Sequence, residues 1–138
     1  MTTQFPLARI GAVAALAGPV LLIAATLAHP MTAAPADLPA AFAEYAQDPY
    51  WVASHLGQFF GLTLVGAGLI ALAWMMEPGW PTAWARLGSW LTAVSVALAG
   101  VLQAVDGVAL QVMARRWMAA TGEAIGRASC RERVSSPV

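Results

Sequence analysis

The chain has 138 residues, of which 59% are hydrophobic and 10% are charged, and its seven basic and seven acidic side chains balance to a formal net charge of zero. Soluble domains are roughly half apolar and about a quarter charged, so this composition excludes an ordinary soluble domain and favours a membrane protein. The single cysteine excludes an intramolecular disulfide, and the sequence contains no basic patch that indicates nucleic-acid binding.

The first predicted element is an apolar run over residues 10–28, which follows Arg9. A secretory signal peptide begins in a similar way, but its apolar region is typically about 7 to 15 residues long, and this run has nineteen. We therefore expect a retained membrane span. Pro19 should bend this helix without interrupting it, because neighbouring helices can satisfy the carbonyl that a proline leaves free.

The only long polar segment, residues 29–54, contains three acidic residues and no arginine. Asp37 is expected to cap a short helix that lies on the membrane surface or over the bundle. The pair Asp48-Pro49 is typical of a helix start, so the central helix is predicted over residues 49–76. Its stretch from residue 55 to residue 76 would be ~33 Å long, enough to cross a hydrocarbon layer of about 30 Å.

Small and aromatic residues of the central helix and its flanks indicate packing and depth in the membrane. Gly57 and Gly61 form a GxxxG spacing, which allows close approach of a neighbouring helix in lipid. Four aromatic residues are predicted to lie at the two headgroup regions, Tyr50 and Trp51 at one and Trp74 and Trp80 at the other.

A turn at residues 77–84 returns the chain to the membrane, with Thr82 as a candidate cap for the next helix. The third span is predicted over residues 84–113, and its helical pattern continues to about residue 120. The sequence thus predicts an all-α transmembrane helical bundle with three spans, at about 10–28, 49–76 and 84–113. Arg9 and Arg86 favour a cytoplasmic N-terminus at an inner (plasma) membrane, although Arg115 and Arg116 lie on the opposite side.

Residues 125–134, IGRASCRERV, resemble the conceptual translation of a widely used sequencing adapter over ten successive codons. The resemblance implies that the natural sequence is interrupted near Ala124 and that Cys130 is not native. Residues 1–124 would then be the N-terminal part of a multi-pass membrane domain, residues 125–138 a non-native tail, and further spans would follow downstream. The alternative is a natural, basic and disordered tail.

Polar residues are predicted to meet at one membrane face, because successive spans alternate in direction. His29, His55 and Asp106 occupy the ends of the three spans at that face, with Gln58 one turn after His55 and Gln103 one turn before Asp106. A carboxylate near the apolar layer is costly unless it is paired, and His55 is the expected partner of Asp106.

The order of these residues along the chain resembles that of uncharacterised multi-pass membrane proteins of high-GC bacteria. The resemblance covers residues 5–120 and rests on Trp51, His55, Gln58, Arg86, Gln103, Asp106 and Gly107. It implies a bacterial membrane location and brings no activity with it.

Three interpretations of this polar cluster remain open. It is a structural clasp between helices, a transport, proton-relay or small-ligand site, or a metal or haem site. The last lacks the local spacing of a recognised metal motif, so we predict no metal and no cofactor. No nucleophile arrangement or phosphate-binding loop supports catalysis. The expected partners are the lipid bilayer and either further copies of the chain or a larger membrane complex, in which the protein would be an accessory subunit.

Overall fold

The computed structural model describes residues 4–29, 32–34 and 36–135, and the side chains in these ranges from residue 5 to residue 122. All regular secondary structure of these residues is helical: α1 (Gln4–Leu27), α2 (Leu38–Gln47), α3 (Trp51–Met75), α4 (Trp80–Ala104), the π-helical turn η1 (Val105–Ala109) and α5 (Leu110–Ser135). Three segments are long and apolar enough to cross a membrane, Phe5–Leu27, Trp51–Met75 and Trp80–Gly122. The predicted all-α architecture with three spans is confirmed.

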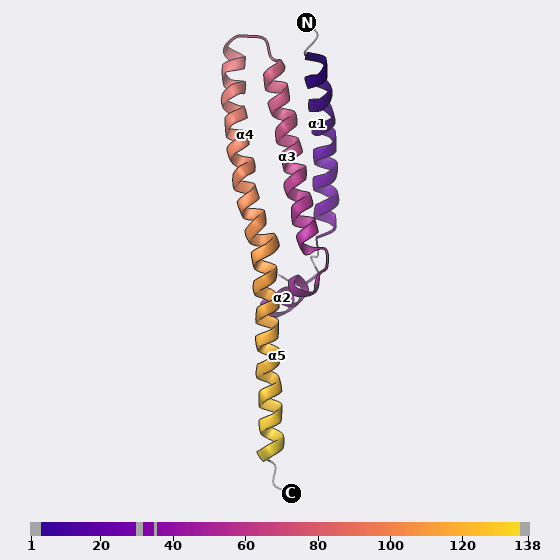
Figure 1. Cartoon of the computed structure of the whole chain (residues 1–138), viewed down its shortest axis with the longest axis vertical. Helices are drawn as coiled ribbons and strands as arrows, with labels where there is room; N and C mark the ends of the chain where they lie inside the picture. The colour runs from indigo at the N-terminus through magenta and orange to yellow at the C-terminus, as the bar shows by residue number, and fades with distance from the viewer. Residues whose placement is uncertain (1–3, 30–31, 35, 136–138) are drawn as a thin grey trace.

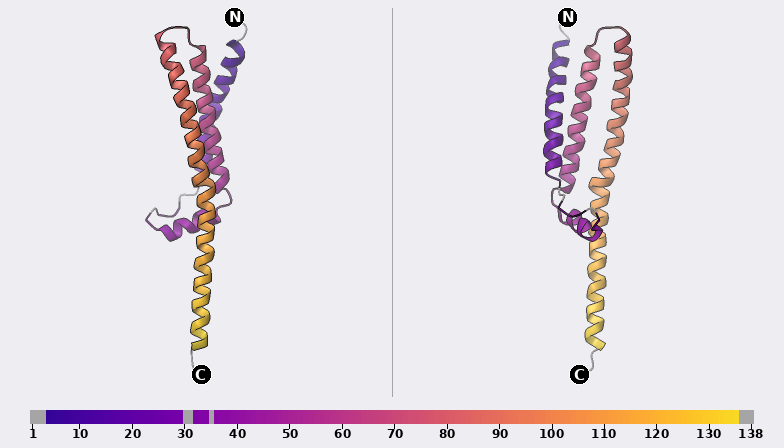
Figure 2. Two further views of the ribbon diagram at one scale, coloured as in Figure 1. Left: turned by 60° about the vertical axis from the view of Figure 1, so that its left-hand side comes forward. Right: turned by 180° about the vertical axis from the view of Figure 1, so that it is seen from behind.

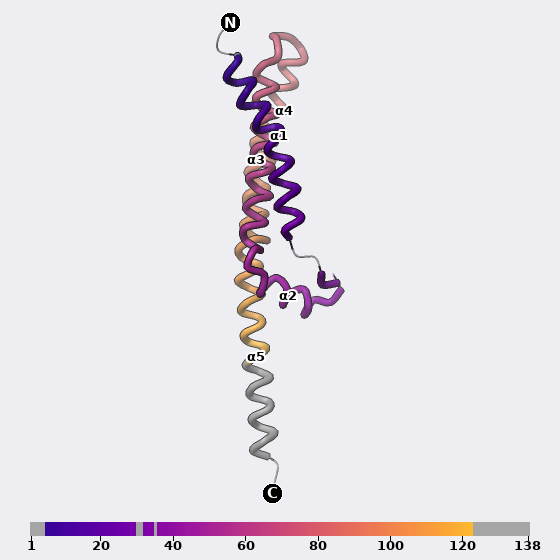
Figure 3. The backbone as a smooth tube through the Cα atoms, turned by 90° about the vertical axis from the view of Figure 1, so that its right-hand side faces the viewer, coloured from indigo at the N-terminus to yellow at the C-terminus, as the bar shows by residue number. Residues whose placement is uncertain are grey.

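The helices α1, α3 and α4 lie side by side with α3 in the middle (Figure 1). The beginning of α1 and the turn between α3 and α4 are at one end of this row, and α2 is at the other end. α2 projects sideways and crosses α5, as two further views show (Figure 2). The described part of α5 continues the line of α4 beyond the three-helix row (Figure 3).

The contact between α1 and α3 is the most extensive in the described structure and depends on small residues. A β-carbon placed on Gly61 would lie 2.7 Å from the backbone nitrogen of Leu22, and one placed on Gly18 would lie 2.7 Å from that of Val65. Gly57 lies against Ala25 in the same interface. The two predicted packing glycines, Gly57 and Gly61, therefore both face α1, where the absence of a side chain lets the backbones approach closely.

Helix starts differ from the predicted ones by a few residues. α1 is continuous across Pro19, as expected, but it begins at Gln4 rather than near residue 10. α3 begins at Trp51 rather than residue 49, because the Asp48 carboxylate accepts the backbone N–H of Tyr50 at 2.8 Å within a turn. The prediction that this helix starts at Pro49 was wrong by two residues.

The third span contains the predicted range of about 84–113 and extends beyond it at both ends. α4 begins at Trp80, where Gly79 is the N-cap with a φ of 159°, a value that residues with a side chain rarely adopt. Thr82 lies within the helix instead of capping it, and its hydroxyl donates to the carbonyl of Glu77. The helical run then continues through η1 and α5 to Ser135. This run includes the backbone of most of the tail that was expected to be non-native or disordered.

α2 has the predicted N-cap, since the Asp37 carboxylate accepts the backbone N–H of Ala40 at 3.2 Å. Its other end is held by α5. The Gln111 amide donates to the carbonyls of Tyr45 and Asp48 at 3.2 and 2.9 Å, and Arg115 Nε donates to the carbonyl of Ala46 at 3.1 Å. These bonds satisfy carbonyls that a helix end leaves free, and the arginine charge also complements the negative end of the helix dipole.

Candidate functional site

Aromatic and imidazole rings pack together, with their planes tilted, at the end of the row where α1 ends and α3 begins. The ring of His29 lies 4.6 Å from that of Trp51 and 4.9 Å from that of His55, measured between centroids. Trp51 is 4.7 Å from His55 and 4.4 Å from Tyr45 of α2. The structure thus brings together the two histidines that the sequence analysis selected, with Trp51 between His29 and α2.

Trp51 is only 2% exposed, and its indole nitrogen contacts the π-turn η1 that follows α4. Its Nε1–H donates to the backbone carbonyl of Asp106 at 2.9 Å. The other three predicted headgroup aromatics, Tyr50, Trp74 and Trp80, are exposed. The depth of all four in a membrane stays a prediction.

The carbonyl of Asp106 is available because the helix is locally π-helical. In an α-helix it would accept the N–H of Leu110, but that N–H bonds to the carbonyl of Val105, five residues earlier. Gly107 in the same turn lies against α3, where a β-carbon would be 2.7 Å from Cβ of His55. The π-turn therefore supplies both an acceptor for Trp51 and room for His55.

His55 is 6% exposed, and its ring has a defined tautomer. Nδ1 lies 2.8 Å from the carbonyl of Trp51, which can only accept, so in the neutral ring Nδ1 carries the proton and Nε2 the lone pair. Among the described residues, Nε2 makes no hydrogen bond.

The expected pairing of Asp106 with His55 is not formed through the carboxylate. The Asp106 side chain is half-buried, and in the described part of the chain it makes no hydrogen bond or ion pair. The link from Asp106 to α3 runs through its backbone carbonyl and Trp51. A carboxylate that is partly open to solvent retains some hydration, which reduces its need for a charged partner.

The two predicted glutamines lie one turn deeper and join three helices. Gln103 of α4 donates its amide to Oε1 of Gln58 at 3.3 Å, and Gln58 donates to the hydroxyl of Thr26 in α1 at 3.4 Å. The hydroxyl of Thr26 in turn donates to the carbonyl of Leu22. This chain of side chains crosses the whole row of helices, although the buried Oε1 of Gln103 has no partner among the described residues.

A metal site gains no support from this geometry. Within residues 4–29, 32–34 and 36–122, no group of three or more His, Cys, Asp or Glu side chains is arranged to hold a metal ion. The two histidine rings lie against each other and against Trp51, and a haem between them would need more than their 4.9 Å separation.

Glu44 binds Thr32 and Ala33, which lie between α1 and α2 in the chain. Its carboxylate accepts the hydroxyl and backbone N–H of Thr32 at 2.7 and 2.9 Å, and the backbone N–H of Ala33 at 2.7 Å. The hydroxyl bond from Thr32, followed by the two backbone bonds, lowers the pKa of Glu44 below its ordinary value.

This lowered pKa predicts a local transition in acid. At pH values above the ordinary glutamate pKa of about 4.3, the carboxylate is ionised and its bonds to Thr32 and Ala33 are fully formed. These bonds are lost as the pH falls through the lower pKa of the folded state. Amide chemical shifts of Thr32 and Ala33 should move together with a midpoint below the ordinary value. Glu44→Gln should weaken these bonds at neutral pH, whereas the exposed Glu77→Gln should leave both shifts unchanged. A midpoint above the ordinary value would contradict the assignment.

Several residues of the site were not selected from the sequence. Thr26 and Ser54 look like ordinary small polar residues in apolar helices, and their bonds to backbone carbonyls are visible only in three dimensions. Gln111 could have been predicted from the sequence, because it is a lone amide side chain one turn after Gly107 in an apolar helix. It is 5% exposed in the structure.

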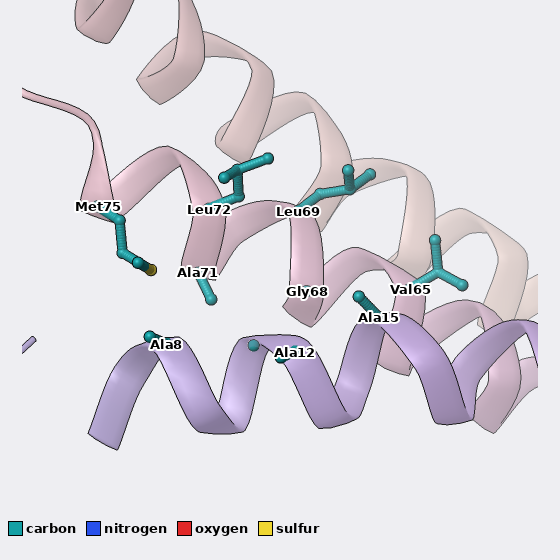
Figure 4. A pocket seen from close by; sticks show the side chains of 10 residues that line it. Ala8, Ala12, Ala15, Val65, Gly68, Leu69, Ala71, Leu72 and Met75 are labelled. Atoms are coloured by element: carbon teal, nitrogen blue, oxygen red, sulfur yellow. The ribbon is translucent and has the colours of Figure 1, made fainter. Parts of the chain in front are cut away.

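An apolar groove lies at the opposite end of the α1–α3 contact, distant from the polar cluster along α3. It has a volume of about 400 Å³, and the small residues Ala8, Ala12 and Ala15 of α1 line it opposite the larger Leu72 and Met75 of α3 (Figure 4). No ionisable side chain lines it, so it supplies no chemistry to the candidate site.

Comparison of the sequence with protein-family models and with curated proteins, and of the fold with solved structures, gave no match.

Proposed function

We propose that the chain is a multi-pass membrane protein in which the polar cluster at the α2 end is a structural clasp. The single observation that carries this proposal is the hydrogen bond from the Trp51 indole to the Asp106 carbonyl. It joins α3 to the π-turn at the point where the helix has released that carbonyl. The Gln103, Gln58 and Thr26 chain supports the same role one turn deeper.

We place the protein in a bacterial inner membrane with its N-terminus in the cytoplasm. Arg9 and Arg86, near the end of the row that holds the N-terminus, support this orientation through the positive-inside rule. Arg115, at the other end, has a structural role at the C-terminus of α2. The resemblance to membrane proteins of high-GC bacteria supports the location.

A proton-relay or small-ligand site is the second candidate, and two free polar groups favour it. Nε2 of His55 and the carboxylate of Asp106 make no hydrogen bond among the described residues. Histidine and carboxylate groups at the edge of the apolar layer often mark ion or proton pathways.

Two substitutions separate the clasp from the relay. In the clasp, Gln103→Leu should lower the free energy of unfolding by about 1 kcal/mol, since it removes an interhelical bond. Asp106→Asn should change it by less than about 0.5 kcal/mol, because the carboxylate is unpaired while the backbone carbonyl remains. Unfolding would be followed in mixed micelles, and proton flux in liposomes that contain a pH-sensitive dye. A proton flux of the parent chain that Asp106→Asn abolishes without loss of stability would replace the clasp by the relay.

A role as an accessory subunit of a larger membrane complex is favoured by the exposure of the longest span. Only 6% of the most apolar part of Trp80–Gly122 is buried in the described structure. Copurification of a defined partner in a fixed ratio supports this role, whereas a chain that purifies alone and remains folded in lipid opposes it.

A further inference from the structure

The groove between α3 and α4 near their connecting turn is a second site, distinct from the polar cluster. It has a volume of about 490 Å³ and is lined by Ile70, Trp74, Arg86, Ser89, Trp90 and Ala93. We propose that it binds one anionic phospholipid, with the phosphate on Arg86 and an acyl chain along the apolar wall.

The lining residues are ordered by chemistry along the helices. Arg86, Trp90 and Ala93 are spaced by four and three residues on one face of α4, so the lining passes from a cation to an aromatic ring and then to a small apolar residue. Arg86 lies ~9 Å from the start of α4, close to the membrane boundary that the turn marks. This order matches a phospholipid, whose charged headgroup lies above its acyl chains.

Arg86 is available for a ligand. Its side chain is exposed, and within the described residues it makes no hydrogen bond or ion pair. The hydroxyl of Ser89 already donates to the carbonyl of Ala85 at 2.9 Å, so the guanidinium is the charged donor that this lining offers to a ligand. A guanidinium matches a phosphate group with two parallel hydrogen bonds.

Two exposed tryptophans complete the groove, Trp74 from α3 and Trp90 from α4. Their rings are large and apolar and each carries one N–H donor, which is why tryptophan is enriched at the headgroup level. They would flank the glycerol region while Ile70 and Ala93 contact the chain.

Other grooves of the molecule provide internal comparisons. On the other side of the same helix pair, a groove of about 260 Å³ is lined by residues such as Ala85, Gly88 and Thr92 and by no charged residue. A groove of about 340 Å³ beside α1 contains Arg9 with Ile10 and Val13 but no tryptophan. Arg9 is thus a matched control, being an exposed arginine at the same end of the row outside the proposed site.

Native mass spectrometry of the purified full chain tests the site. The chain is offered equal amounts of phosphatidylglycerol and phosphatidylcholine with identical acyl chains. We expect it to retain the anionic lipid roughly fivefold over the zwitterionic one, the preference that one arginine near an anionic headgroup supplies. Arg86→Gln should abolish this preference, and Arg9→Gln should keep it. Ala93→Leu, at an exposed position in the groove, should reduce the retention of both lipids.

Three results would overturn the proposal. Equal retention of the two lipids by the parent chain would show that Arg86 makes no specific contact with the anionic headgroup. Equal losses in Arg86→Gln and Arg9→Gln point to general surface charge. Displacement of the lipid by excess inorganic phosphate, with no effect of Ala93→Leu, points to a free-anion site. Circular dichroism of each variant verifies that its helices are intact.

Discussion

Replacing Gly61 by alanine is expected to lower the free energy of unfolding by about 3 kcal/mol, at the upper end of the usual cost of overpacking. The added carbon would lie 2.7 and 2.9 Å from the backbone nitrogen and Cα of Leu22. Backbone atoms cannot rotate away as a flexible side chain can, so α1 and α3 must separate along their contact. Unfolding in mixed micelles measures the loss.

Gly88→Ala is the matched control for this substitution. A β-carbon at Gly88 meets no atom within 4 Å, and the position is also inside a helix. Alanine is a better helix former than glycine by about 1 kcal/mol, so this variant should be as stable as the parent chain or more stable. A Gly61→Ala variant that unfolds like Gly88→Ala would show that α1 and α3 do not approach this closely.

Replacing Trp51 by phenylalanine should cost about 2 kcal/mol, because it leaves a part-buried carbonyl without its donor. The loss should also be detectable in the π-turn. With the indole N–H removed, the carbonyl of Asp106 loses its donor, while the π-turn stays, because an α-helical path of the same length would rotate Gln111 away from α2. The amide and carbonyl chemical shifts of residues 105–110 report this change.

Trp80→Phe separates the hydrogen bond from a general effect of losing an indole. Trp80 is 82% exposed, so its replacement should leave both the stability and the shifts of residues 105–110 unchanged. If Trp51→Phe also left those shifts unchanged, the hydrogen bond from the Trp51 indole to the carbonyl of Asp106 would be wrong.

The three spans could be predicted because membrane insertion depends on length and apolarity, both of which are local properties of the sequence. The runs that contain Pro19, Gly61 and Leu98 each became a long helix. Helix ends were less predictable. Pro49 fits a first helical turn, yet Asp48 uses its carboxylate in a turn before Trp51, and Gly79 caps α4 where Thr82 was expected to do so.

The proximity of His29 and His55 could be predicted from the alternating directions of the spans alone. The chemistry within the cluster could not, because it depends on which atom of each residue faces a neighbour. Asp106 was selected for its carboxylate, but it contacts α3 through its carbonyl, and no sequence pattern marks the π-turn that frees that atom. Likewise, Gln111 bonds to the carbonyls of Tyr45 and Asp48, which lie 66 and 63 residues earlier in the chain. No local sequence pattern could predict contacts at this separation.

The π-turn has a consequence for how this helix tolerates changes in length. Removing one residue from an α-helix rotates everything after it by about 100°, which elsewhere in α4 would turn Gln111 away from α2. A π-turn holds one residue more than the α-helical path requires. Deleting a residue from Val105–Ala109, such as the exposed Val108, would therefore convert the turn to α-helix and keep α4 and α5 in phase. This is the place in the long helix where the chain can be shortened by one residue without misaligning its two contact faces.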